Sequence, residues 1–222
     1  MNFEEIRKKI KETGKRPYAL TFDDSPKNDR KVINLLDKRG VKGTFYVSGK
    51  HFSQPWTLTI YKDHEIGLHG LNHVKLDTLF KKPLRKNLRF KLEKGLREKF
   101  NALYKKNSLI NKTELDYDIL CTKCLIEAAY SKVPTSIAFP CHAGIKNEEL
   151  VNYVETSYNL YVRRPLPNLG VKKDYYIFHA EKFNEKGFVD FEKKLDRWVE
   201  NRVLCTYSTL RKLYDAGIIP EE

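Results

Sequence analysis

Apolar runs with the spacing of strands alternate with stretches of helical periodicity along most of the chain. Seven short runs rich in β-branched and aromatic residues predict strands over 18–22, 43–47, 65–68, 136–139, 159–162, 175–178 and 203–207. Between most of these runs, apolar residues recur at helical spacing, as at Val32, Leu35 and Leu36 or at Phe188, Phe191, Leu195 and Trp198. This alternation predicts parallel strands joined by right-handed crossovers, in a sheet that is either doubly wound or closed into a barrel.

Residues with reactive side chains follow the ends of most of the predicted strands. They are Asp23 and Asp24 after the first strand, His69 and His73 after the third, Cys141 and His142 after the fourth, Arg163 and Arg164 after the fifth, and His179 after the sixth. In a barrel of parallel strands, the carboxyl ends of the strands form one rim, and this rim carries the active site. The pattern therefore favours an α/β fold of the barrel type, distorted and with fewer than eight units.

The composition is that of a globular protein, with 222 residues of which 41% are hydrophobic. A chain of this length can form its own core, so we expect a single domain over residues 1–222. The net charge is +13, but twelve Lys or Arg and only two Glu lie between Lys81 and Lys112. That segment therefore carries +10 of the total, and we interpret residues 80–112 as a basic insert in a nearly neutral domain.

The insert has the pattern of an amphipathic helix. From Pro83 onward, apolar residues recur every four positions with basic residues between them, at Leu84, Leu88, Leu92, Leu96 and Phe100. A second helix is expected over 113–130. Three interpretations of the basic face stay open: a solvated or oligomer-contacting surface, contact with an anionic membrane surface, or binding of a phosphate-rich polymer.

No segment approaches the ~18 consecutive apolar residues of a transmembrane helix, and the N-terminus lacks the apolar core of a secretory signal. We therefore expect a cytoplasmic protein. The four cysteines are too few and too scattered for a disulfide framework. We expect Cys121 and Cys124 to lie on a helix and pack in the protein core, and Cys205 to lie in a buried strand. His51 and His64 have no partner pattern, so we expect them to be solvated.

A candidate metal site combines two histidines with an aspartate pair. His69 and His73 are four residues apart, which on a helical turn places both imidazoles on one face. Alone, such a pair is more typical of two surface histidines than of a metal site. Asp23 and Asp24, however, end a predicted buried strand, where two carboxylates are costly to desolvate unless a cation or a proton compensates them. Two imidazoles and one carboxylate leave an open position for water, as in catalytic zinc sites.

The same residues resemble the motifs of polysaccharide deacetylases, the NodB-homology group of carbohydrate esterase family 4. Residues 21–26, TFDDSP, resemble the TFDDGP motif, and residues 69–73, HGLNH, resemble the H-S/T-x-x-H motif. Residues 137–142, IAFPCH, are similar to the FAYPYG form of the third motif, and residues 176–179, YIFH, to the hydrophobic run with histidine near the C-terminus. The resemblance implies a distorted (β/α)7 barrel of the polysaccharide deacetylase type.

The resemblance also implies a role for each matching residue. It makes Asp24, His69 and His73 the ligands of a divalent metal, most often Zn²⁺, with Asp23 as the general base and His179 as the general acid. In the third motif it implies that the backbone N–H of Cys141 binds the oxyanion. Pro140, Cys141, His142 and Arg164 complete the predicted substrate and oxyanion residues.

Three departures from the motifs concern the shape of the site. Ser25 replaces a glycine of the first motif, and His142 stands where the family usually has glycine. The third motif often carries an arginine that orients the base, but no arginine lies between Val133 and Cys141. Arg163 or Arg164 could take that role, and a surface arginine pair is the alternative.

Elementary chemistry agrees with a hydrolase. Amide hydrolysis at neutral pH needs a nucleophile stronger than water, and a zinc-bound water with a pKa near ~7 supplies one. A carboxylate can take its proton, and a histidine can return one to the leaving nitrogen. We predict a metal-dependent deacetylase, acting on C–N bonds other than peptide bonds, that removes N-acetyl groups from an amino sugar or polysaccharide. The alternatives are a hydrolase of small linear or cyclic amides and a non-catalytic binder of carbohydrate or polyanion.

Overall fold

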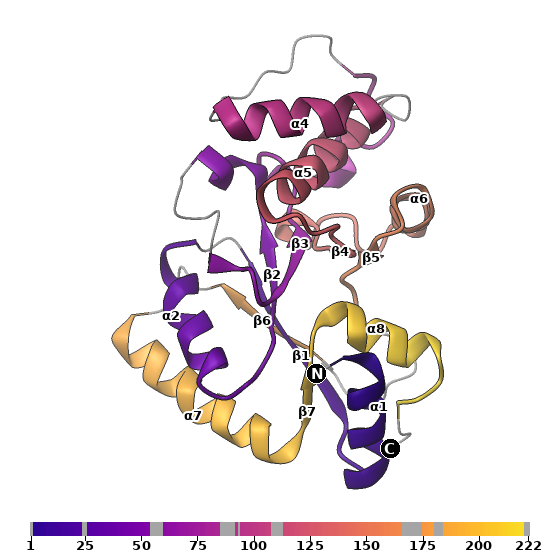
Figure 1. Ribbon diagram of the computed structural model, residues 1–222. Helices are drawn as coiled ribbons and strands as arrows, with labels where there is room; N and C mark the ends of the chain where they lie inside the picture. The colour runs from indigo at the N-terminus through magenta and orange to yellow at the C-terminus, as the bar shows by residue number, and fades with distance from the viewer. Residues whose placement is uncertain are drawn as a thin grey trace. The chain divides into compact units, whose positions relative to one another are not determined.

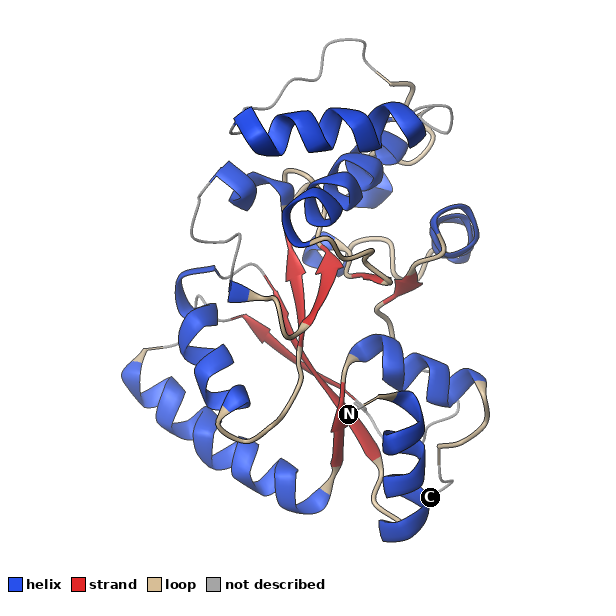
Figure 2. Cartoon of the chain, viewed as in Figure 1, coloured by secondary structure: helices blue, strands red, loops and turns tan. Residues whose placement is uncertain are grey.

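Strands and helices alternate along the chain, as the sequence predicts (Figures 1 and 2). The computed structural model describes residues 2–23, 26–53, 60–84, 92, 94–107, 113–165, 175–179 and 184–219. The described strands are β1 Pro17–Asp23, β2 Thr44–Val47, β3 Glu65–Leu68, β4 Ser136–Ile137, β5 Tyr161–Val162, β6 Tyr175–His179 and β7 Val203–Cys205. Hydrogen-bonded neighbours follow the order β5-β4-β3-β2-β1-β6, and β7 pairs with β1.

The helices fall between these strands. They are α1 Phe3–Thr13, α2 Pro26–Asp37, α4 Lys94–Asn107, α5 Glu114–Tyr130, α6 Glu148–Tyr158, α7 Glu185–Asn201 and α8 Tyr207–Asp215. Three short 3-10 turns, η1 Gly49–Ser53, η2 Leu76–Thr78 and η4 Pro140–His142, follow strand ends or connect elements. The chain forms two compact units: unit 1 comprises residues 1–45, 63–65 and 164–222, and unit 2 comprises residues 46–62 and 66–163.

Unit 1 is organised around β1, whose seven residues are all buried. Such a strand has apolar packing on both faces, which is typical of parallel α/β sheets. In parallel pairing, β6 matches the carboxyl half of β1 and β7 matches its amino half. Phe22 of β1 stacks on Phe45, with ring centroids 4.7 Å apart, and meets Phe191 of α7 edge-on. This packing fixes the height at which β1 ends.

Unit 2 combines the parallel strands β3, β4 and β5 with the long helix α5. Eleven residues of α5 are buried, which makes this helix the main core element of the unit. A buried carboxylate, Asp116, accepts the N-cap hydrogen bonds of Thr113 and the hydroxyl hydrogen bonds of Tyr153 and Tyr158 from α6. The hydrogen bonds that Asp116 accepts offset the free-energy cost of burying its charge. Asp116 therefore links the start of α5 to α6.

The basic insert differs from the prediction at its start. Pro83 forms an isolated antiparallel bridge with Thr113 instead of opening a helix, and α4 begins at Lys94. Residues 85–91, 93 and 108–112 of the predicted insert lie outside the described residues. Leu96 and Phe100 are buried where α4 packs on α5 (Figure 1). The apolar stripe of α4 is therefore used within unit 2, and its Lys and Arg side chains are exposed.

All seven predicted strands are present: β1 and β6 are longer than predicted, β3 has the predicted bounds, and the other four are shorter. The predicted strand 203–207 ends at Cys205, and Tyr207 is the first residue of α8 rather than the last of a strand. Cys121, Cys124 and Cys205 are buried, as expected. The expectation of a solvated His64 is wrong: its side chain is buried, and its Nδ1 accepts the N–H of Gly43. Within the described ranges, no helix has both the length and the apolar character needed to cross a bilayer.

Candidate active site

The predicted base and the predicted acid are neighbours across one strand pair of unit 1. Asp23 is the last residue of β1 and His179 the last of β6, and the parallel register pairs their Cα atoms. Asp23 is only 2% exposed. The side chain of His179 lies outside the described part of the structure. Strand pairing alone thus brings these two positions together at the same height.

His69 follows β3 in unit 2 and has a fixed tautomer. Its Nδ1 lies 2.8 Å from the carbonyl oxygen of Ala138. Because a carbonyl can only accept, Nδ1 carries the proton and donates it, which leaves Nε2 as the basic nitrogen of the neutral ring. The paired ends of β3 and β4 produce this contact, since Leu68 is in register with Ile137. His69 is 2% exposed and is oriented as metal-ligating histidines are.

His73 completes the pair that the sequence predicts. The ring centroids of His69 and His73 are 4.9 Å apart, with the rings inclined at 60°. Ligating imidazole nitrogens lie about 2 Å from a zinc ion, so two rings at this separation can bind one ion. His73 has a φ of 56°, in the left-handed region that side chains rarely adopt, which points to a functional constraint on this residue.

The third predicted ligand, Asp24, lies outside the described residues. Within the part of the chain that the structure describes, no three His, Cys, Asp or Glu side chains form a metal-binding group. The two histidines nevertheless have the donor chemistry, tautomer and separation that a divalent ion requires, so the residues present fit such an ion.

The third motif forms a strained turn after β4. Cys141 and His142 have φ values of 56° and 54°, two consecutive left-handed residues without glycine. The N–H groups of His142 and Ala143 donate to the carbonyls of Phe139 and Pro140, which closes the turn. Pro140 is buried, Cys141 is exposed, and His142 is half-buried. Strain of this kind is typical of functional sites, and the turn presents Cys141 and His142 at the surface.

The two arginines after β5 differ in their surroundings. Arg163 is 2% exposed, and its guanidinium carbon lies 4.7 Å from the centroid of the Tyr46 ring. Its backbone N–H donates to the carbonyl oxygen of Ile137. Arg164 is half-buried, and its N–H donates to the hydroxyl oxygen of Tyr207. The alternative of a surface arginine pair is therefore wrong for Arg163.

Sequence reasoning missed one residue near the histidines, Asp118 of α5. It is 4% exposed, and its Oδ1 accepts the N–H of Leu71 at 2.9 Å. Burial raises the pKa of this carboxyl to about 7, although hydrogen bonds from the N–H groups of Leu71 and Asn72 favour its ionised form. The available signal was an aspartate inside the apolar pattern of a helix predicted to be buried.

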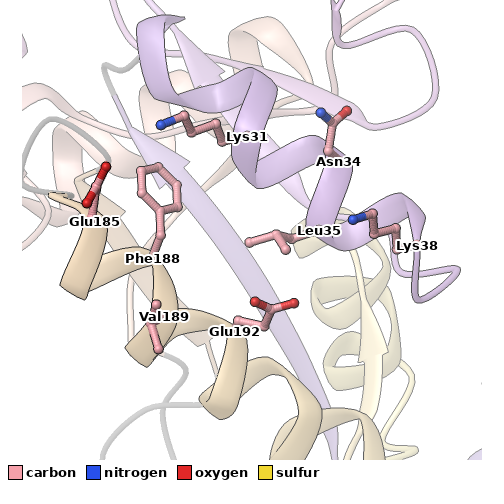
Figure 3. A pocket seen from close by; sticks show the side chains of 8 residues that line it. All are labelled: Lys31, Asn34, Leu35, Lys38, Glu185, Phe188, Val189 and Glu192. Atoms are coloured by element: carbon pink, nitrogen blue, oxygen red, sulfur yellow. The ribbon is translucent and has the colours of Figure 1, made fainter.

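A groove between α2 and α7 of unit 1 is a separate feature (Figure 3). Its volume is about 340 Å³, and the ammonium of Lys31 lies 5.1 Å from the centroid of the Phe188 ring, in a cation–π contact. Figure 3 shows charged side chains of both helices around Leu35, Phe188 and Val189. None of the predicted site residues lines the groove, so the candidate active site lies elsewhere.

Comparison with known proteins points to one family. Residues 10–158 match the family model described as polysaccharide deacetylase. A chitin deacetylase from Pestalotiopsis sp is 35% identical over 69 residues, which cover 28% of this chain and only 23% of that relative's length.

Two solved structures have a similar fold. A peptidoglycan deacetylase from Bacillus subtilis, PdaC, superposes with a TM-score of 0.57 and 18% identity, over 91% of this chain and 93% of that chain. A family 4 acetyl xylan esterase from Clostridium thermocellum, solved with a cobalt ion, gives a TM-score of 0.55 and 18% identity, over 92% and 95% of the two chains. The predicted α/β fold of the polysaccharide deacetylase type is confirmed.

Proposed function

Because the chain belongs to the polysaccharide deacetylase family, we propose that it is a metal-dependent hydrolase of amide bonds that removes N-acetyl groups from an amino sugar or polysaccharide. The observation that carries this proposal is the pair His69 and His73, whose rings lie 4.9 Å apart with the His69 tautomer fixed by Ala138. Paired histidines, of which one donates its second ring N–H to a backbone carbonyl oxygen, are typical of catalytic metal sites. Their position in the second family motif agrees with that role.

We assign the metal ligands to His69, His73 and Asp24, and propose Zn²⁺ as the ion. Two imidazoles and one carboxylate suit zinc and leave a coordination position open. When bound, a divalent ion of this kind lowers the pKa of water and polarises the acetyl carbonyl. The family resemblance supplies the assignment of Asp24.

Asp23 is the proposed general base and His179 the proposed general acid. Asp23 is buried at the end of β1, where strand pairing holds its backbone, and its carboxylate would take the proton of the attacking water. His179, in register with it on β6, would give a proton to the departing amine. The reaction thus breaks the C–N bond of the acetamide, with water as the co-reactant and acetate and an amine as products.

The strained turn after β4 has the proposed role of oxyanion and substrate contact. The backbone N–H of Cys141 would donate to the developing oxyanion, with Pro140, His142 and Arg164 at the substrate. Arg163 or Arg164, the two arginines that follow β5, is the proposed residue that orients the base.

The direct test is metal analysis of the purified protein together with acetate release from a substrate panel. The panel contains N-acetylglucosamine oligomers, peptidoglycan fragments and small linear and cyclic amides. The proposal predicts about one divalent ion per chain and acetate release from the N-acetylated sugars, abolished by a chelator and restored by Zn²⁺.

Two results favour the alternatives. Turnover of small amides without release of acetate from sugars would make the chain an amide hydrolase of this fold. Retention of metal with no turnover of any compound, together with binding of carbohydrate or a polyanion, would make it a non-catalytic binder. A protein without bound metal that is equally active after chelation contradicts the proposed mechanism.

A further inference from the structure

The two histidines are held by a loop that does not have the geometry of a helix or strand. We call residues 69–73 the histidine loop. Gly70 has a φ of 74° and His73 a φ of 56°, so two of its five residues are in the left-handed region. Such a segment lacks a repeating hydrogen-bond pattern of its own, and its backbone groups must be satisfied by other parts of the molecule.

His69, at the start of this loop, is hydrogen-bonded to Val47, Ser48 and Ala138, whereas the backbone of the following residues is bonded to two elements of unit 2. Its carbonyl groups at Gly70 and Leu71 accept the N–H groups of Gly49 and Lys50, the first residues of η1, at 2.9 and 2.8 Å. Its N–H groups at Leu71 and Asn72 donate to the carboxyl of Asp118 on α5. The backbone after His69 is therefore held by the backbone of η1 and by one side chain, that of Asp118.

Burying the carboxyl group of Asp118 at this position costs free energy. Asp118 is 4% exposed on a helix whose neighbouring buried positions are almost all apolar, and burial of a carboxyl without a full set of partners costs free energy. A smaller apolar residue would fill the position in the helix, but it would leave the N–H groups of Leu71 and Asn72 without this acceptor.

The contact is also tightly built. A side chain at Gly70 would place its Cβ 3.2 Å from Asp118 Oδ1 and 3.4 Å from the ring of Pro140. Glycine is thus required at this position both by its backbone conformation and by the close approach of the carboxyl group. The histidine loop, Asp118 and the first residue of the strained turn form one packed cluster.

We propose that Asp118 is the positioning residue of the metal site: its carboxyl group holds the N–H groups of Leu71 and Asn72 and thereby sets the geometry from which His69 and His73 bind the ion. The inference rests on the proposed metal-dependent function. Asp118 does not touch the ion or the substrate in this role. It acts through the backbone of the loop, as the partners of ligating side chains do in other metal sites.

The test compares two buried aspartates of the same helix. Asp118→Ala and Asp118→Asn are set against Asp116→Ala, which removes a carboxylate that accepts hydrogen bonds from Thr113, Tyr153 and Tyr158. Three quantities are measured: Zn²⁺ affinity by competition with a chromophoric chelator, the visible absorption spectrum of the Co²⁺-loaded protein, and amide hydrogen exchange at Leu71 and Asn72 in the metal-free protein.

We expect Asp118→Ala to lower Zn²⁺ affinity by about 10–100-fold, the usual effect of losing a partner of a ligand, and to change the Co²⁺ spectrum. Exchange at Leu71 and Asn72 should become faster. Asp118→Asn keeps one acceptor oxygen and should lie between the parent and Asp118→Ala in all three measurements. Asp116→Ala should lower the melting temperature while leaving the Co²⁺ spectrum and the Zn²⁺ affinity unchanged.

The inference is wrong if Asp118→Ala has the parent's affinity, spectrum and exchange, or if Asp116→Ala changes the spectrum and affinity equally. If Asp118→Ala does not fold, Asp118→Asn decides, and parent values in that variant overturn the inference. A parent protein that binds no divalent ion contradicts the proposed function itself. A parent that binds the ion with an affinity insensitive to Asp118 contradicts only the positioning role.

Discussion

The strand ends of unit 1 and the histidine loop of unit 2 hold their predicted functional residues in different ways. Asp23 and His179 are terminal residues of paired parallel strands, and regular backbone hydrogen bonds set their relative height. His69 and His73 flank a loop with left-handed residues, whose backbone is satisfied by η1 and by the side chain of Asp118. The first arrangement follows from sheet pairing, whereas the second depends on tertiary contacts.

The difference predicts how each region responds to substitution. At the strand ends, a side chain can be changed with little effect on the backbone, because the ladder bonds do not involve side chains. In the histidine loop, a change at one position alters the geometry of the others, because a few side chains and one glycine fix the whole segment. A substitution at Asp23 should therefore change activity without changing stability, whereas a substitution in the histidine loop should change both.

The largest effect is expected for His69→Ala. This variant loses a predicted metal ligand and the hydrogen bond to Ala138, so both metal binding and deacetylation should be lost. Elemental analysis and acetate release measure the two effects. The control is His51→Ala in η1 of the same unit, which should retain both. A His69→Ala protein with a full complement of metal would remove this residue from the ligand set.

Asp23→Asn should separate chemistry from metal binding. Loss of a general base typically lowers the rate by about 10²–10⁴-fold, while the amide preserves the shape of the side chain. We expect metal content and melting temperature close to those of the parent, with kcat reduced by that factor. Asp63→Asn, at an exposed aspartate of the same unit, is the matched control. Parent activity in Asp23→Asn would contradict the assignment of the base.

Alkaline pH should weaken the helix that supports the histidine loop. Burial raises the pKa of the Cys124 thiol from 9.0 to about 11, and it raises that of Cys121 further. Because the folded-state pKa is the higher one, the stabilisation is complete below about pH 9 and is lost as the pH rises toward 11. The loss should reach about 2 kcal/mol for Cys124, measured by urea unfolding across this range.

The control for this pH effect is the exposed thiol. Cys124→Ala should show a smaller fall in unfolding free energy between pH 9 and 11, whereas Cys141→Ala should follow the parent. If the parent and Cys124→Ala lose stability equally over this range, the buried thiol is not the cause.

Gly70→Ala tests the tight construction of the histidine loop. The left-handed backbone costs a residue with a side chain about 1–2 kcal/mol, and the new Cβ would approach Asp118 Oδ1 to 3.2 Å. The melting temperature should fall by several degrees, and Zn²⁺ affinity should fall with it. The matched control is Gly95→Ala in α4, where a Cβ meets no atom within 4 Å. Unchanged stability and affinity in Gly70→Ala would contradict the rigid-loop interpretation.

The smallest effect is expected at the ion pairs of unit 1. Arg39 donates to Asp196 and Glu192 of α7, at 2.6 and 3.0 Å, and these acidic partners are exposed. Arg39→Met should lower stability by about 0.2–1 kcal/mol, less so at high salt, and should leave metal affinity unchanged. Thermal unfolding at two salt concentrations checks this. A large loss of Zn²⁺ affinity would show that the two regions are more strongly coupled than their separate packing indicates.

Several parts of the fold could be predicted from periodicity because they follow from local physics. The run of β-branched and aromatic residues in β1 and the spacing of Phe191 and Leu195 in α7 each determine an element without reference to the rest of the chain. The start of α4 could not be predicted in this way. The apolar repeat continues back to Pro83, but that residue pairs with Thr113 instead.

The sequence by itself determined the type and order of the elements, the positions of the histidines and aspartates at strand ends, and the family. These depend on side-chain patterns along the chain, which the sequence contains in full. Only the tertiary structure decided the tautomer of His69, the burial of Arg163 and His64, and the hydrogen bond between Leu71 and the buried Asp118. Each of these depends on a partner far away along the chain, and the free energy of burying a charge or fixing a proton is set by that partner.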